Sequence, residues 1–142
     1  MSDAVPPPLN GVLETSLYVD DMARARQFYE AVLGLVPMFQ DARLCAYPVG
    51  DRSVLLLFLR GSTLATVHLP GGTIPPHDGA GRLHCALAVA DADLPAWEAR
   101  LAAQGISLEG RTQWPRGSTS VYFRDPDGHL LELATPGLWA IY

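Results

Sequence analysis

The clearest structural signal in this chain is the segment VYFRDPDGHLLEL, residues 121–133. Two short apolar runs flank Asp125-Pro126-Asp127-Gly128, and an Asp-Gly pair between strand-like runs is a strong hairpin signal. An earlier segment, YPVGDRSVLLLF at residues 47–58, repeats this pattern around Gly50-Asp51. Two similar hairpins in one chain predict an internal duplication.

The segments upstream of the two hairpins are also similar. Residues 12–35 read VLETSLYVDDMARARQFYEAVLGL, and residues 83–106 read LHCALAVADADLPAWEARLAAQGI. Each contains a strand-like run, Asp residues suited to cap a helix, apolar residues at helical spacing, and a Gly that ends the helix. Aligning Val19 with Val89 also aligns Asp21 with Asp91.

Three strand candidates follow each predicted helix, so each half is a βαβββ module. We therefore predict an α+β protein in which two tandem modules form an open, cup-like, eight-stranded mixed sheet. The expected strands after the helices are 36–40, 43–49 and 53–60 in the first module, and 107–113, 118–124 and 129–135 in the second. The expected boundaries are a flexible lead at 1–11, modules at 12–60 and 82–135, a linker loop at 61–81, and a C-terminal extension at 136–142.

Composition excludes several classes of protein. Of the 142 residues 49% are hydrophobic and 18% are charged, which is typical of a globular domain. The net charge of -5 and the absence of a Lys/Arg cluster argue against nucleic acid as a partner. The longest apolar run is too short to cross a membrane, and the first ten residues lack the pattern of a signal peptide. We expect a cytoplasmic protein, in which Cys45 and Cys85 are unpaired thiols.

The repeat places two potential metal ligands at equivalent positions. Glu14 stands five residues before Val19, and His84 stands five residues before Val89. A third candidate is Glu132, because an ionised carboxylate within an apolar strand is costly to bury unless it is paired or coordinated. Three protein ligands with open positions are typical of a catalytic metal site, and this set suits one divalent Zn, Ni, Mn, Fe or Co ion.

Each of these residues also has a structural explanation. Glu14 could be an exposed residue near a strand start, and His84 could be a hydrogen-bonded His at the core or at an edge. Glu132 could form an ion pair with Arg124 or Arg116. An ungapped alignment of the two hairpins places Leu57 opposite Glu132, which leaves no fourth protein ligand.

The segment FYEAVLGL, the hairpin at 121–133 and the duplicated βαβββ order resemble the vicinal-oxygen-chelate superfamily, from about Val12 to Thr135. This superfamily includes glyoxalase I, extradiol dioxygenases, bleomycin-resistance proteins and fosfomycin-resistance transferases. The resemblance implies a metal inside the cup, held by Glu14, His84 and Glu132, and a homodimer. It leaves open whether modules pair within one chain or between two.

The function implied by the resemblance is that of a metal-dependent lyase, isomerase or dioxygenase acting on a small substrate through two adjacent oxygens. Glu132 or Glu14 would act as the catalytic base. The alternative is a non-catalytic drug- or metabolite-binding protein. Further candidates for contact with the substrate are Ser16, Tyr18, Leu55, Leu57, His77, Arg116 and Tyr122.

Overall fold

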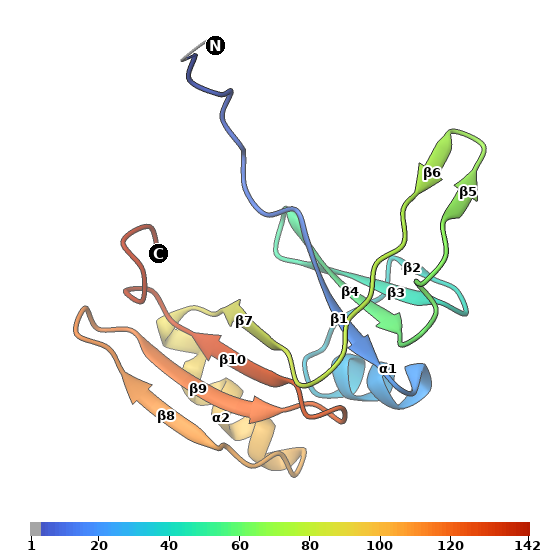
Figure 1. Cartoon of the computed structure of the whole chain (residues 1–142). Helices are drawn as coiled ribbons and strands as arrows, with labels where there is room; N and C mark the ends of the chain where they lie inside the picture. Colours follow the sequence, from blue (N-terminus) through green and yellow to red (C-terminus); the bar gives the residue numbers. More distant parts are fainter. Residues whose placement is uncertain (1–3) are drawn as a thin grey trace.

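The computed structural model describes residues 4–142 and contains two tandem βαβββ modules (Figure 1). The elements of the first module are β1 (Glu14–Val19), α1 (Met22–Ala31), β2 (Phe39–Gln40), β3 (Leu44–Val49) and β4 (Ser53–Leu59). Those of the second are β7 (His84–Ala88), a 3₁₀ turn (Asp91–Asp93), α2 (Leu94–Ala103), β8 (Gly110–Gln113), β9 (Thr119–Arg124) and β10 (Leu130–Ala134). The predicted α+β class and the two-module order are therefore confirmed.

The eight module strands form two separate four-stranded sheets. Their orders are β1-β4-β3-β2 and β7-β10-β9-β8, so β1 and β7 occupy the same edge position in their own sheets. In each sheet the first strand runs parallel to the last strand of its module, and the other pairs are antiparallel. Each edge strand therefore keeps one side without strand partners within residues 4–142, and such an edge is a template for pairing with another chain.

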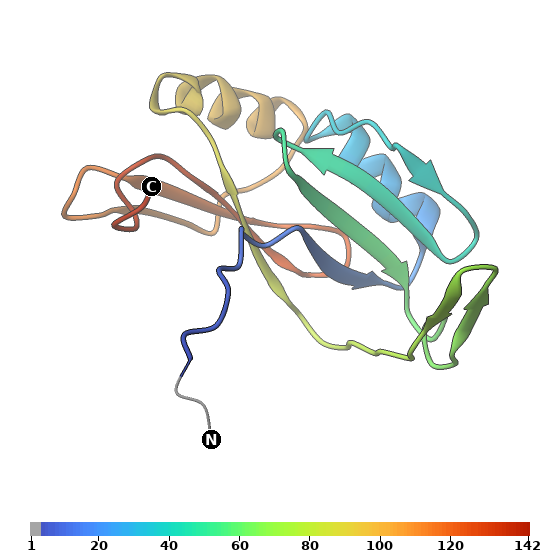
Figure 2. The same cartoon turned by 90° about the horizontal axis from the view of Figure 1, so that it is seen from above.

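Strand alternation gives each sheet one face that packs on the helices and one face without helices. On β10, Leu131 and Leu133 belong to the hydrophobic core, whereas Glu132 between them points to the opposite face. Both modules contribute to the same core cluster, and Figure 2 shows α1 and α2 on the same side of the molecule. We call the opposite face of each sheet its helix-free face.

The predicted helix signals are confirmed in the first module and only partly in the second. Asp21 caps α1, because its carboxylate accepts a hydrogen bond from the backbone N–H of Arg24. Asp93 precedes α2 but makes no side-chain capping bond, since it is the last residue of the 3₁₀ turn and has helical rather than extended backbone geometry. Gly34 and Gly105 follow the two helices with φ of +70° and +74°, as predicted for glycines that end helices.

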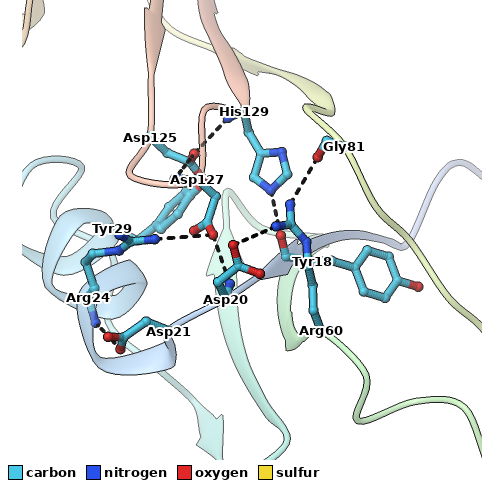
Figure 3. A network of polar contacts seen from close by, with 10 residues as sticks. All are labelled: Tyr18, Asp20, Asp21, Arg24, Tyr29, Arg60, Gly81, Asp125, Asp127 and His129. Atoms are coloured by element: carbon cyan, nitrogen blue, oxygen red, sulfur yellow. Dashed lines mark hydrogen bonds and ion pairs between the residues drawn. The ribbon is translucent and has the colours of Figure 1, made fainter.

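The turn between β9 and β10 fastens the second module to the first. Its Asp125 is buried and accepts a 2.7 Å hydrogen bond from the hydroxyl of Tyr29 in α1. The carboxylate of Asp127 accepts a 2.9 Å bond from the backbone N–H of Asp20, after β1 (Figure 3). The turn at residues 125–128 therefore forms polar contacts from the second module to both α1 and the end of β1.

His129 adds a second contact at this junction. Its ring is buried, and its Nδ1 accepts a 2.8 Å hydrogen bond from the backbone N–H of Leu83. The other ring nitrogen, Nε2, lies 2.7 Å from the carbonyl oxygen of Tyr18 and donates to it (Figure 3). Both ring nitrogens are used by backbone groups of the two modules, so the imidazole is neutral in this arrangement.

The predicted linker loop contains a hairpin that sequence did not indicate. Strands β5 (Val67–Leu69) and β6 (Gly72–Ile74) pair with each other and stand away from the two sheets (Figure 1). The described part of the N-terminal lead runs away from the sheets in both views. Among the described residues, no helix has the length and apolar character needed to span a membrane.

Candidate functional site

The helix-free face of the second sheet carries the strongest candidate site. His84 is the first residue of the edge strand β7, and its side chain is 51% exposed. Glu132 lies on the neighbouring strand β10 with a side chain only 6% exposed. Alternation along β10 directs this carboxylate away from the core leucines and toward His84.

Hydrogen bonding fixes how the His84 ring is presented. Its Nδ1 lies 2.8 Å from the carbonyl oxygen of Leu130, and a carbonyl only accepts, so Nδ1 carries a proton. Its Nε2 lies 3.2 Å from Oε1 of Glu132. In a neutral imidazole with this tautomer, the Nε2 lone pair faces a carboxylate oxygen. A proton, a cation or a water molecule can bridge these two atoms.

The other oxygen of Glu132 has a fixed partner. Oε2 accepts a 2.6 Å hydrogen bond from the hydroxyl of Ser120 on β9, and Ser120 is fully buried. The ion pairs considered from sequence are not formed. Arg124 instead pairs with Glu109, and Arg116 donates to the carbonyl oxygen of Leu138.

Glu14 does not join this pair within one chain. It is an exposed residue at the start of β1, on the edge of the first sheet. It lines a groove of about 350 Å³ between the beginning of β1 and β4 and the edge strand β7. Residues 4–142 contain no group of three His, Cys, Asp or Glu side chains placed to hold a metal ion. The monomer therefore brings together two of the three predicted ligands.

Strand register changes the residue that corresponds to Glu132 in the first module. Glu14 pairs with Val54 as His84 pairs with Leu130, so two residues further along Leu56 matches Glu132. The ungapped alignment gave Leu57, which is wrong by one residue: it matched Tyr47 with Tyr122, whereas strand pairing makes Ala46 the equivalent of Tyr122. Leu56 lies on the helix-free face and is apolar, so the first module offers no carboxylate there.

The two leucines predicted to contact a substrate belong to the core. Leu55 and Leu57 are 2% and 0% exposed and pack in the cluster shared with the helices. The alternation that places Glu14 on the helix-free face points these two side chains the other way. Leu56 and Val54 take their place on the helix-free face.

Tyr18 and His77 contact each other. A hydrogen bond joins the Tyr18 hydroxyl and Nδ1 of His77, and both rings pack against Phe58 with centroid separations of 5.9 and 4.7 Å. Burial and the nearby Asp78 carboxylate raise the pKa of Tyr18. The linker therefore covers this part of the first sheet, since Gly79 also lies directly against the Tyr18 ring.

The remaining candidates divide between the two sheets. Ser16 lies half-buried on β1 between Glu14 and Tyr18, on their face of the sheet. Tyr122 lies directly opposite Glu132 in the β9–β10 pair and is half-buried. Arg116 lies in the β8–β9 turn and is exposed, where it holds the C-terminal segment through Leu138. Ser16 and Tyr122 border the candidate ligands, whereas Arg116 does not.

The donor set at His84 and Glu132 fits a divalent metal. Metal-binding His residues usually donate their other ring N–H to a carbonyl or carboxylate, as Nδ1 of His84 does with Leu130. The buried carboxylate of Glu132 is an oxygen ligand of the type preferred by first-row divalent ions. His84 and Glu132 are therefore the two residues of this face with the chemistry to hold such an ion.

Sequence reasoning missed Ser120. Strand alternation does indicate the face on which Ser120 lies. It stands two positions before Tyr122 in the strand TSVYFR and so shares the face of Glu132. The strand pairing that brings its hydroxyl to the carboxylate could not be read from composition.

The sequence is similar to a known protein family and to individual members of the FosB group. Residues 11–133 match the family model described as Glyoxalase/Bleomycin resistance protein/Dioxygenase superfamily. The metallothiol transferase FosB of Shouchella clausii is 31% identical over 129 residues, which cover 89% of this chain and 81% of that protein. The FosB of Bacillus licheniformis is 43% identical over 53 residues, but this match spans only 34% of its length.

A solved structure extends the likeness over almost the whole chain. The crystal structure of a lactoylglutathione lyase from Agrobacterium tumefaciens superimposes with a TM-score of 0.85 at 33% identity. The match covers 94% of this chain and 99% of that one.

Proposed function

Because the chain belongs to the glyoxalase/bleomycin resistance protein/dioxygenase superfamily, we propose that it is a metal-dependent enzyme acting on a small substrate with two adjacent oxygens. The observation that carries this proposal is the His84–Glu132 pair. An imidazole whose Nδ1 is committed to a carbonyl presents its Nε2 to a buried carboxylate at 3.2 Å, on a face open to solvent.

We further propose that Glu14 comes from a second copy of the chain. Glu14 and His84 start equivalent edge strands, yet no three-residue metal site exists within residues 4–142. A twofold axis that sets β1 of one copy beside β7 of the other would bring Glu14 to the partner's half-site, and would do so twice. Pairing of the free edges would also satisfy their unpaired backbone groups.

When bound, a divalent ion in this site supplies Lewis-acid polarisation of the two substrate oxygens. The side chains of the protein orient the metal ligand, accept the proton and bind the substrate. Ser120 holds one oxygen of Glu132, so this carboxylate keeps a fixed orientation. Glu14 is exposed at its strand end and has the freedom to accept a proton from substrate. Tyr122 and Ser16 border the site and can hydrogen-bond the substrate.

The named relatives support a thiol as part of the chemistry. One is a metallothiol transferase and another is a lactoylglutathione lyase, so both names refer to thiols or their conjugates. We therefore propose that the substrate is a small oxygen-rich molecule that reacts with a thiol or is carried as its adduct. An α-ketoaldehyde supplied with a low-molecular-weight thiol is the first substrate to test.

Metal content and chelator sensitivity test the proposal. Untagged protein purified without chelator is expected to carry close to one first-row metal per chain by mass spectrometry. His84→Ala is expected to lose it, whereas Glu109→Gln, which alters an exposed glutamate of the same module, is expected to keep it. Turnover that persists in EDTA would refute the metal-dependent reaction.

The competing function is that of a binding protein that sequesters a small molecule. The apolar helix-free face around Leu56 in the first module favours it. Such a protein would bind its ligand unchanged in EDTA and would tolerate His84→Ala. Calorimetry of ligand binding with and without chelator separates the two functions.

A further inference from the structure

Behind the carboxylate of Glu132 lies a chain of hydrogen bonds that runs in one direction only. The indole Nε1–H of Trp114 lies 2.9 Å from Oγ of Ser120 and can only donate to it. The hydroxyl of Ser120 then donates its own proton to Oε2 of Glu132 at 2.6 Å. Each donor orients the next, because an indole cannot accept and an ionised carboxylate cannot donate.

These hydrogen bonds leave one oxygen of the Glu132 carboxylate free to bind an ion. Oε2 of Glu132 is held by Ser120, and Oε1 faces Nε2 of His84 at 3.2 Å. Ser120 is fully buried and Glu132 is 5% exposed, so solvent does not supply these bonds instead. Charge-assisted hydrogen bonds of this kind fix the plane and rotamer of a carboxylate.

The internal duplication shows that the fold does not require these polar groups. In the first module Leu56 stands where Glu132 stands in the second, and its pairing with Ala46 matches that of Glu132 with Tyr122. Two residues earlier on the neighbouring strand, Leu44 takes the place of Ser120. One module therefore has leucines at both positions, whereas the other has a serine bonded to a glutamate.

We infer that Trp114 and Ser120 are positioning residues for the metal-binding carboxylate of Glu132. This inference rests on the proposed function. Groups that orient a metal ligand from behind raise its affinity for the ion, and their loss typically lowers metal affinity or activity by about 10- to 100-fold. Trp114 also supplies a fluorescence signal for the site, since two hydrogen bonds connect its indole to the Glu132 carboxylate.

The test measures metal binding by the intact protein with Mn²⁺ or Co²⁺ as the probe. Ser120→Ala is expected to weaken binding by about 10- to 100-fold, and Ser120→Thr, which keeps the hydroxyl, is expected to restore most of it. Trp114→Phe is expected to weaken binding less, because Ser120 still reaches Glu132. Thermal unfolding without metal should stay close to wild type in Ser120→Thr and Trp114→Phe.

Fluorescence gives a readout that needs no turnover. Binding of Co²⁺ is expected to change tryptophan emission to a similar extent in wild type and in Trp139→Phe, which alters an exposed indole, and much less in Trp114→Phe. Equal metal affinity in wild type and Ser120→Ala, with both folded, would overturn the inference. So would an emission change of undiminished size in Trp114→Phe.

The outcomes separate this inference from the proposed function. A wild-type protein that refuses both ions would refute the metal-dependent function itself. In that case hydrogen exchange of the Trp114 indole N–H, measured by NMR without metal, still tests the chain of hydrogen bonds. Protection that is lost in Ser120→Ala would support it, and an indole proton that exchanges freely in wild type would refute it.

Discussion

Mixing two inactive variants tests whether the site is built from two copies of the chain. In the proposed dimer each site takes Glu14 from one copy and His84 with Glu132 from the other. Glu14→Gln removes one ligand from both sites of its homodimer, and His84→Ala does the same. A heterodimer of the two variants has one site with all three ligands intact and one site that lacks both Glu14 and His84.

The expected recovery follows from this geometry. Random reassortment of equal amounts makes half of the dimers mixed, and each mixed dimer has one intact site of two, so about a quarter of the wild-type metal content returns. Heterodimers purified through two different affinity tags should carry about half of the wild-type content. The assay is metal per chain by mass spectrometry after refolding the mixture together.

The control mixes two variants whose altered ligands, His84 and Glu132, lie in the same chain. His84 and Glu132 lie 3.2 Å apart in one chain, so mixing His84→Ala with Glu132→Gln restores no intact site. Recovery in this control would refute the division of ligands between copies. A shared site is also refuted if mixing Glu14→Gln with His84→Ala restores no metal binding while the wild-type protein binds metal.

Three further predictions concern metal, pH and thiol reactivity. Metal at 100 times its Kd should raise the free energy of unfolding by about 2.7 kcal/mol, measured by denaturant titration, and His84→Ala should abolish this gain. Tyr29→Phe removes the hydrogen bond to Asp125 and should lower the free energy of unfolding by about 1.5–3 kcal/mol. Burial raises the pKa of Tyr29 far above its ordinary value of 10.0, so its contribution is complete below about pH 10 and is lost as pH rises further. Alkaline unfolding should therefore be less steep in Tyr29→Phe; an identical pH profile would contradict this assignment. Burial also raises the pKa of the Cys45 thiol, which should react with a disulfide reagent much more slowly in native than in unfolded protein.

Much of the fold could be predicted because its signals are local. The hairpin turn at Asp125–Gly128, the N-cap Asp21 and the glycines after both helices act within a few residues. The features that were not predicted depend on more distant contacts. The β5–β6 hairpin lies in a stretch rich in Gly and Pro, and the division into two sheets depends on which strand edges meet.

The candidate site could be predicted in part for the same reason. His84 and Glu132 follow from alternation within two strands, and the structure places them 3.2 Å apart. Register could not be predicted, because matching the two tyrosines Tyr47 and Tyr122 shifts the first hairpin by one residue, and the strand pairing gives Leu56 in place of Leu57. Ser120 depends on that same register and was therefore missed.

On the proposed pairing, the two walls of each completed site differ in chemistry. The wall from the second module carries the ligands His84 and Glu132 and the hydroxyl of Tyr122. The wall from the partner's first module would add the Glu14 carboxylate and then the apolar face around Leu56 and Val54. A substrate that fits both walls has an oxygen-bearing end for the ion and an apolar end for the leucine. Leu56→Asp is therefore expected to raise KM for substrates with an apolar substituent while leaving metal content unchanged, and an equal effect on substrates without that substituent would contradict this division.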